Sequence, residues 1–191
     1  MDVLEAIRAR RAVRAFLPNE LAKEAVEELL LLATYAPSAL NRQPWSFLVL
    51  TGRDRLAGLE DAVRASCLAA VERSAGDEPS EIVQHVRDLV AARFPIFHGA
   101  PAAVVVLVPA GDRTAVVDGA LAAQNLMLAA HAHGLATCPV GLAAPYFQDP
   151  ANLATLGVPA DRYAALVLAL GEPDGPPPAM PERRAPTVHW T

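Results

Sequence analysis

Residues 102–108 form an uninterrupted apolar run, Ala102-Ala103-Val104-Val105-Val106-Leu107-Val108. The run has the length of a strand, and its β-branched side chains favour extended backbone. Because no polar residue alternates with the apolar ones, we expect a central strand buried on both faces of a sheet. The rest of the chain must therefore cover that strand from two sides. Further runs of strand formers bring the expected strands to four and lie at 45–50, 136–140 and 163–170.

Apolar residues at helical spacing predict helices between these strands. Asp2 and Ser80 are placed to cap two of them, and Pro37 prevents another from continuing. A last short helix is expected to begin at Asp149-Pro150 and to end before Gly157, because proline favours helix starts and glycine favours helix ends. The longer predicted helices span residues 2–10, 20–34, 53–73, 80–93 and 113–133.

Three segments are too polar or too rich in turn residues for regular structure. Residues 36–44 are bounded by prolines and predict a surface loop, and residues 75–79 predict a turn. The segment 172–191 begins with a stretch dense in proline and glycine, so we expect an extended arm. At 191 residues, the chain is expected to form one domain, 1–191, that carries this arm at its end.

The composition excludes several classes of protein. At 53% hydrophobic and 19% charged residues, with a mean hydropathy of +0.25, the chain is too apolar to remain disordered. No apolar run reaches the ~18 uncharged residues that a membrane span requires. The formal net charge of −5, with 16 basic and 21 acidic residues mixed along the chain, argues against nucleic-acid binding by bulk electrostatics. We therefore expect a soluble globular protein that binds neither membranes nor nucleic acid.

Cys67 and Cys138 are the two cysteines, and their spacing fits no zinc site, CxxC redox centre or secreted disulfide scaffold. The first residues, Met1-Asp2-Val3-Leu4-Glu5, lack the basic region and apolar stretch of a signal peptide. Both observations indicate a cytoplasmic protein. Because no residue near Cys138 in the sequence is identifiable as an activating base, we interpret it as a buried small hydrophobic residue.

Several common sequence signatures are absent. The chain has no GxGxxG after a strand, no GxxxxGKS/T, no GxSxG and no HExxH. Dinucleotide-binding, P-loop, serine-hydrolase and zincin classes thereby lose their main support. His131 and His133 lie two residues apart on a predicted helix and therefore on different faces, so we expect no metal site.

Arginine is clustered in two places, whereas Lys23 is the single lysine. A guanidinium group prefers planar, bidentate partners such as phosphate. The clusters therefore indicate an anion site or, as the plainer alternative, solvated charge. They consist of Arg8, Arg10, Arg11 and Arg14 at the end of the first predicted helix and of Arg183 and Arg184 in the arm.

The loop from Pro37 to Trp45 also has a composition suited to binding. Its small residues permit close backbone approach, and its amides can donate to and accept from the edge of a heteroaromatic ring. The plainer alternative is a turn followed by a packed tryptophan.

Two segments resemble motifs of the FMN-dependent nitroreductase family. Arg10-Arg11-Ala12-Val13-Arg14-Ala15-Phe16 is similar to its RRSxRxF start, and Ala36-Pro37-Ser38-Ala39-Leu40-Asn41-Arg42-Gln43-Pro44-Trp45 is similar to its APSxxNxQPW loop. Residues 97–101, residues 118–135 and the Gly171-Glu172-Pro173 turn also follow the family's order. The resemblance covers nearly the whole chain.

This resemblance implies an α+β fold with three layers, α-β-α, around a mixed, largely antiparallel central sheet. It further implies a homodimer with two FMN molecules at its interface. The implied reaction is a ping-pong transfer, in which NADH or NADPH gives a hydride to FMN and an electron-poor small molecule, a nitroaromatic or a quinone, then takes it. No side chain is implied as a catalytic acid or base, and Arg14 is the residue expected to stabilise negative charge on the flavin.

The resemblance assigns cofactor contacts to three groups of residues. Arg10, Arg14 and Arg184, with Arg183, would hold the phosphate and the pyrimidine edge of FMN, and Arg11 and Ala12 would line the same side through their backbone. The loop residues Pro37, Ser38, Ala39 and Asn41 would reach the flavin of the other subunit. The residues that would lie along the ring and offer a backbone N–H to its hydride-accepting nitrogen are Pro139, Val140, Gly141 and Leu142.

Two departures from the family pattern bear on the substrate. Ala12 stands in place of the usual serine, and the link from Pro109 to Arg113 is too short to hold inserted helices above a substrate. The aromatic residues of 94–98 and 146–147 are candidates for covering the flavin or for the core. The alternatives left open are the same fold with dehydrogenation, dehalogenation or flavin fragmentation, a flavin-binding redox sensor, and a structural dimerisation protein.

Overall fold

Four strands form one sheet in the computed structural model, which describes residues 2–74 and 81–191. Each neighbouring pair of strands is antiparallel. The four strands expected from the sequence are thereby confirmed, and the apolar run occupies an inner position as β2. In spatial order the strands are β1 (Ser46–Thr51), β2 (Ala102–Pro109), β4 (Arg162–Gly171) and β3 (Ala136–Pro139).

Helices fill the connections between the strands, as the apolar spacing predicts. Asp2 caps the first helix by accepting a hydrogen bond from Glu5 N at 2.8 Å, and Asp149 caps the last by accepting from Ala151 N at 2.8 Å. The predicted cap Ser80 and the predicted turn at 75–79 lie outside the described residues. The helices are α1 (Val3–Ala9), α2 (Lys23–Ala33), α3 (Arg53–Ser74), α4 (Glu81–Ala91), α5 (Arg113–Ala132), α6 (Ala144–Phe147) and α7 (Pro150–Thr155), with short 3₁₀ turns η1 (Ala39–Asn41) and η2 (Gly141–Ala143).

Helix α2 begins at Lys23 rather than at Glu20, which corrects the expected boundary. The chain before it is held extended against the start of the arm: Leu17 N donates to Glu172 O at 3.0 Å, and Asn19 Nδ2 donates to Glu172 Oε2 at 2.8 Å. These long-range bonds compete with the first helical turn, and the sequence pattern alone does not show them.

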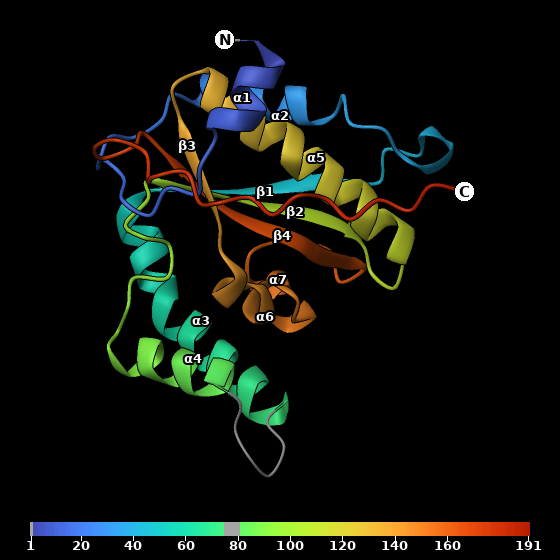
Figure 1. The fold of residues 1–191 in the computed structure, drawn as a ribbon. Helices are drawn as coiled ribbons and strands as arrows, with labels where there is room; N and C mark the ends of the chain where they lie inside the picture. The colour runs from blue at the N-terminus through green and yellow to red at the C-terminus, as the bar shows by residue number, and fades with distance from the viewer. Residues whose placement is uncertain (1, 75–80) are drawn as a thin grey trace.

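The sheet is covered on both faces, which gives three layers (Figure 1). Helices α1, α2 and α5 lie on one side, and α3, α4, α6 and α7 lie on the other. Side chains of β2 alternate between two apolar clusters: Val104 and Val106 face α2 and α5, whereas Val105 and Leu107 face the opposite layer. The expected α+β, three-layer α-β-α fold is confirmed. No helix within 2–74 or 81–191 is both long and apolar enough to cross a membrane.

One parallel pairing lies at the outer edge of the sheet, beside β3. The segment Arg10–Arg14 runs beside this strand, with Ala12 paired to Thr137 in a parallel bridge and Val13 N donating to Thr137 O at 3.1 Å. The N-terminal arginine cluster is thereby fixed along the outer edge of the sheet.

Helix α5 lies unusually close to the sheet because of Gly119. A Cβ atom built on this residue would lie 2.9 Å from Val108 Cγ1 and 3.2 Å from Ala165 Cβ. Any larger residue would push the helix away from β2 and β4. This contact matters for the site, because α5 carries Asp118, whose carboxylate anchors the loop at 36–45.

Candidate functional site

The Arg10–Arg14 segment begins where α1 ends. Arg11 Nη1 donates to Arg8 O at 2.7 Å and to Arg10 O at 2.8 Å, so the guanidinium satisfies carbonyl groups at the C-terminal end of the helix. This role for the Arg11 side chain was not predicted from the sequence. Arg14 is exposed, and Arg10 is partly buried.

The backbone just after β3 offers two N–H groups to a ligand, those of Gly141 and Leu142, whereas the N–H groups on either side of them are bonded within the protein. Val140 N donates to Val167 O at 2.8 Å, and Ala143 N donates to Val140 O at 3.2 Å. The N–H groups of Gly141 and Leu142 have no hydrogen-bond partner within the described parts of the chain. Apart from Gly141 and its two chain neighbours, no atom of the described residues lies within 4 Å of the position that a Cβ of Gly141 would take, so this face of the backbone is open. A flat ligand can approach it closely.

Next to these donors, Cys138 and His98 form a contact that the sequence did not reveal. The Cys138 thiol lies 3.5 Å from His98 Nε2, although forty residues separate the two. Burial raises the pKa of the Cys138 thiol, and the nearby Arg14 guanidinium opposes that rise. Burial and the positive charge of Arg14 lower the pKa of His98, whereas the negative charge of Glu60 acts to raise it. The directions of the two shifts favour a neutral thiol and a neutral imidazole at neutral pH. The expected burial of Cys138 is confirmed, but His98 is a neighbouring base that the sequence did not identify.

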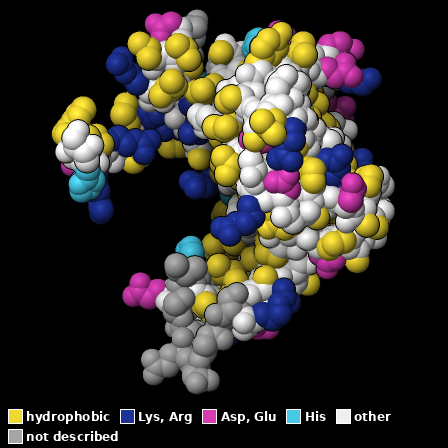
Figure 2. Space-filling view, turned by 90° about the vertical axis from the view of Figure 1, so that its right-hand side faces the viewer, with side chains coloured by type: hydrophobic (Ala, Val, Ile, Leu, Met, Phe, Trp, Pro, Cys, Tyr) yellow, Lys and Arg dark blue, Asp and Glu magenta, His cyan; other side chains and the backbone are white. Residues whose placement is uncertain are grey.

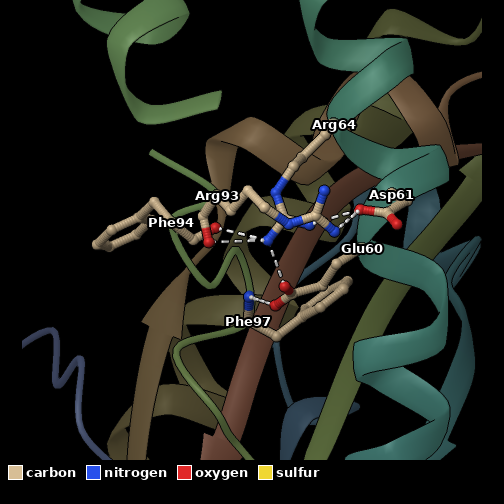
Figure 3. A network of polar contacts seen from close by, with 6 residues as sticks. All are labelled: Glu60, Asp61, Arg64, Arg93, Phe94 and Phe97. Atoms are coloured by element: carbon tan, nitrogen blue, oxygen red, sulfur yellow. Dashed lines mark hydrogen bonds and ion pairs between the residues drawn. The ribbon is translucent and has the colours of Figure 1, made fainter. Parts of the chain in front are cut away.

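A polar network holds the turn that carries His98 (Figure 3). Arg64, only 8% exposed on α3, donates to Phe94 O at 2.9 Å and pairs with the carboxylate of Glu60. Glu60 also accepts from Phe97 N at 3.3 Å. The turn needs this support, because His98 has a φ of +56°, a left-handed conformation that is rare outside glycine.

Most of the aromatic residues near this turn are buried in the core, and Phe94 is partly exposed beside the candidate site. Phe97, Tyr146 and Phe147 are buried in the cluster on the α3 side of the sheet and belong to the core. Phe94 is partly exposed and packs edge-on against the His98 ring, with 5.5 Å between the ring centroids. Phe94 is thus the aromatic residue of this group that remains available to a ligand.

The loop at 36–45 is a built structure with strained backbone. Leu40, Asn41 and Gln43 all have positive φ, between +47° and +53°. Ser38 Oγ accepts from Gln43 N at 2.9 Å, and the buried carboxylate of Asp118 on α5 accepts from Ala39 N at 3.3 Å. Strain of this kind is typical of binding loops. The sequence predicted a loop here, and the structure adds the 3₁₀ turn η1 within it.

This loop lies far from the Arg10–Arg14 segment of the same chain. It is anchored at Asp118 in the first half of α5, whereas the arginine segment lies beside His131 near the end of that helix. Thirteen helical residues correspond to about 20 Å. Figure 1 shows the same separation, with the light-blue loop after α2 at the opposite end of the molecule from the edge of β3.

The arm 172–191 contains no helix and no strand of the sheet. Its start is fixed, because Phe16 pairs with Pro173 and Asp174 N donates to Ala15 O at 3.0 Å. Arg183 and Arg184 lie farther along and are exposed. The space-filling view in Figure 2 shows a deep hollow on one side of the molecule, with Lys or Arg side chains along its wall.

The chain also matches known proteins. The sequence model of the nitroreductase family matches residues 7–172. This chain belongs to the nitroreductase family. Nitroreductase NfnB of Mycolicibacterium smegmatis is 34% identical to it over 182 residues, which cover 80% of this chain and 75% of NfnB.

Solved nitroreductase structures share the whole fold. A nitroreductase with bound FMN from Bacteroides fragilis superposes with a TM-score of 0.82 at 26% identity, covering 100% of this chain and 99% of the other. A mutant of the FMN and NADPH-dependent nitroreductase NfnB from a Sphigopyxis strain has a TM-score of 0.78 at 25% identity with the same coverage. The expected resemblance and fold are therefore confirmed.

The predicted site residues fall into three places in one nitroreductase chain. The first place is the sheet edge at β3, which brings together Arg10, Arg11, Ala12 and Arg14 with Pro139, Val140, Gly141 and Leu142. The second is the separate loop with Pro37, Ser38, Ala39 and Asn41, and the third is the exposed arm with Arg183 and Arg184.

Proposed function

We propose that this protein is a cytoplasmic FMN-dependent oxidoreductase that takes hydride from NADH or NADPH and passes it to an electron-poor small molecule, a nitroaromatic or a quinone, in a ping-pong sequence. The observation that carries the proposal is the edge of β3, where the Arg10–Arg14 segment lies beside two unpaired backbone donors at Gly141 and Leu142. Relatives of the same family bind FMN, and one of them depends on NADPH.

The residues at this edge fit FMN chemically. Arg10 and Arg14, with Arg183 and Arg184 from the arm, would hold the phosphate and the pyrimidine edge, since guanidinium pairs well with both. The Arg11 guanidinium is engaged by carbonyl groups of α1, which leaves its backbone, and that of Ala12, to line the cofactor.

The end of β3 would lie along the ring. Pro139 has no N–H, and the N–H of Val140 is bonded to Val167 O, so both would contribute van der Waals surface. Gly141 or Leu142 would supply the N–H that donates to the hydride-accepting nitrogen. The open space beside Gly141 gives the flat ring room to approach the backbone.

When bound, FMN supplies the chemistry by accepting a hydride from a reduced nicotinamide and giving it to a second substrate. The protein's part is charge and orientation. Arg14 would stabilise negative charge at the pyrimidine edge of FMN, and the pairing of Ala12 with Thr137 holds its segment of the chain beside β3. The neutral His98 beside Cys138 adds no competing positive charge, which leaves this role to arginine.

The proposal includes a homodimer of one-domain chains, residues 1–191, with the flavin at the interface. The loop residues Pro37, Ser38, Ala39 and Asn41 would then reach the flavin of the second copy, which the ~20 Å separation along α5 in one chain supports. Apolar side chains are exposed on that loop and near it: Leu40 in the loop is 94% exposed, and Val117, next to Asp118 on α5, is 59% exposed. Burial of such residues in an interface is favourable.

The visible absorption spectrum tests this function. Purified protein is mixed with FMN, excess flavin is removed, and NADH or NADPH is added without oxygen. Retained yellow colour that bleaches with a nicotinamide is the expected result. Flavin that is retained but never bleached would instead favour a redox sensor, and failure to retain flavin would remove the proposal.

The acceptor needs a separate measurement. Reoxidation of the bleached protein is followed after anaerobic addition of a nitroaromatic or a quinone, and the products are identified by mass spectrometry. A quinone should give the hydroquinone, and a nitroaromatic should give the nitroso compound, or the hydroxylamine once a second reduced flavin supplies two more electrons. An absence of reoxidation by both would point to a different second substrate.

A further inference from the structure

A buried carboxylate on α5 is bonded to the backbone of the loop at 36–45. Asp118 is only 4% exposed, and the next residue, Gly119, fixes the helix closely against the sheet. Both carboxylate oxygens lie 3.3 Å from Ala39 N, which donates to them. Within residues 2–74 and 81–191, no other group donates a hydrogen bond to Asp118 and no cation pairs with it. The single donor to this carboxylate therefore belongs to the loop.

Burial of this carboxylate is unfavourable for the fold. An ionised group loses its hydration when it is buried, and one long hydrogen bond from a neutral N–H replaces little of that hydration. The buried Arg64, by contrast, has both the Glu60 carboxylate and the Phe94 carbonyl as partners. An apolar residue at position 118 would avoid this desolvation. The carboxylate is therefore explained by its action on the loop and not by the stability of the fold.

The loop needs an anchor at this residue. Ala39 begins the 3₁₀ turn η1, and the two residues after it, Leu40 and Asn41, both have positive φ. Left-handed backbone outside glycine is strained and persists only where its surroundings impose it. The turn closes on the same residue, because Arg42 N donates to Ala39 O at 3.1 Å. Asp118 thus holds the residue from which the strained turn starts.

Two further contacts support the other half of the loop. Arg42 pairs with Asp112, the N-cap of α5, at 3.0 Å, and Arg162 at the start of β4 donates to Pro44 O at 3.1 Å. Their side chains are partly open to solvent, which weakens such contacts. Asp118 is the buried support of the loop.

We propose that Asp118 is a positioning residue for the flavin site and holds the loop at 36–45 in the conformation that receives the cofactor of the second copy. This role rests on the proposed function, which assigns four residues of the loop to that flavin. The carboxylate acts through the backbone of Ala39, to which it is bonded. A loop that is already in its binding conformation loses less conformational entropy when the ligand binds.

Hydrogen exchange in the full-length protein without added FMN measures the loop directly. Asp118→Ala should speed amide exchange at residues 39–43 by about tenfold or more, because the turn loses its buried acceptor. Asp118→Asn keeps an oxygen that accepts from Ala39 N, so its exchange should stay within about threefold of wild type. Asp54→Ala removes an exposed carboxylate in the first turn of α3 and should leave exchange in the loop unchanged.

FMN fluorescence titration of the same proteins measures the consequence for the site. Asp118→Ala should weaken FMN binding by about tenfold or more, and Asp118→Asn should restore most of the affinity. The urea midpoint of Asp118→Ala without FMN should stay close to that of wild type, because the variant also removes a buried charge. A residue that served only the fold would lower affinity and urea midpoint together.

A mixed dimer tests which copy the loop serves. One copy carries Arg14→Ala, the other carries Asp118→Ala, and different affinity tags allow the mixed dimer to be purified. If each loop serves the flavin of the other copy, both changes fall in one site, and the mixed dimer should bind one FMN with wild-type affinity. If each loop served its own chain, every site would carry one change and no wild-type site would remain.

Four results, obtained with wild-type protein that binds FMN, would overturn the role of Asp118 alone. They are wild-type loop exchange in folded Asp118→Ala, wild-type FMN affinity in that variant, a parallel fall of affinity and urea midpoint, and a mixed dimer without a tight site. Wild-type protein that binds no FMN would instead remove the proposed function, and the role of Asp118 with it.

Discussion

Neighbouring arginines of the N-terminal cluster perform different tasks. The guanidinium of Arg11 is bonded to the end of α1, whereas that of Arg14 is exposed near Cys138 and His98. Charge alone does not distinguish them in the sequence. The distinction comes from the direction in which each side chain leaves an extended segment that is paired to β3.

Arg14→Ala should leave the fold intact and weaken FMN binding or flavin reduction at least tenfold, because it removes the positive charge proposed for the pyrimidine edge. FMN fluorescence titration measures the first effect, and anaerobic bleaching by NADH or NADPH measures the second. Arg184→Ala should act mainly on binding. Arg113→Ala, an exposed arginine at the start of α5, serves as the control. Wild-type values for Arg14→Ala would contradict its assigned role.

His98 should make stability depend on pH. Its pKa is lowered in the folded protein by burial and by Arg14, so the unfolded chain binds the proton more readily. Its contribution is therefore complete above about pH 6.5, is lost as the pH falls below that value, and stops changing below the folded pKa. Urea denaturation at several pH values should show a smaller loss for His98→Gln than for wild type. Parallel curves for the two proteins would refute this.

At the scale of secondary-structure elements, two contacts determine how the helices on the two faces of the sheet pack against the rest of the fold. Gly119 lets α5 approach β2 and β4, and Arg64 joins α3 to the turn before β2. The first contact depends on the absence of a side chain, and the second depends on a buried charge with several acceptors. Both positions should therefore be sensitive to single substitutions.

Gly119→Ala should destabilise the protein by about 1–3 kcal/mol, since the added methyl group must displace Val108 or shift the helix. Gly58→Ala is the matched control on α3, because its Cβ position lies more than 4 Å from every described atom outside its chain neighbours and the backbone of its own helix. That control should stabilise by roughly 0.5–1 kcal/mol through helix propensity. Chemical denaturation measures both. If both variants changed the unfolding free energy in the same direction, Gly119 would not be needed for the close approach of α5 to the sheet.

Arg64→Met should cost about 3–5 kcal/mol of unfolding free energy, because it leaves the Glu60 carboxylate and backbone carbonyls without their buried partner. Arg93→Met is the comparison: Arg93 pairs with Asp61, but both side chains are 71% exposed. Its loss should lower the unfolding free energy far less than the loss of Arg64 does, because solvent screens an exposed ion pair. Equal effects in urea titrations would argue against the network as the support of the His98 turn.

The regular elements were predictable, because each leaves a local signal. The valine-rich run predicted β2, and the pair Asp149-Pro150 predicted the start of α7. The contact between His98 and Cys138 was not predictable, because it joins a turn and a strand that are distant in sequence. The late start of α2 depends on a tertiary hydrogen bond in the same way. The capping bond of Arg11 is local, but the sequence does not show which of the neighbouring arginines makes it. Local pattern therefore identifies the motifs, and packing decides what each side chain contacts.

At the scale of the whole molecule, the loop and the arginine segment lie at opposite ends of α5. A single chain therefore presents two halves of the proposed site that do not meet. Their use in one site requires a second copy, so assembly and cofactor binding should be linked.

Leu40→Asp tests this linkage, because it places a charge on the most exposed apolar side chain of the loop. Analytical ultracentrifugation should show wild-type protein at twice its 20.2 kDa chain mass and the variant shifted toward monomer. FMN affinity should fall in parallel, by tenfold or more. A monomeric wild type that still binds FMN would contradict a site shared between two copies.

The strand order has a consequence for synthesis. β2 lies between β1 and β4, so one of its edges stays unpaired until β4 has been made. About fifty residues of chain separate Pro109 from Arg162, and at ~5–20 residues per second a ribosome takes about 3–10 s to add them. During that interval the most apolar strand of the protein is open to other nascent chains. Slowed translation between these strands should therefore raise the fraction of the protein lost to aggregation and its demand for chaperones.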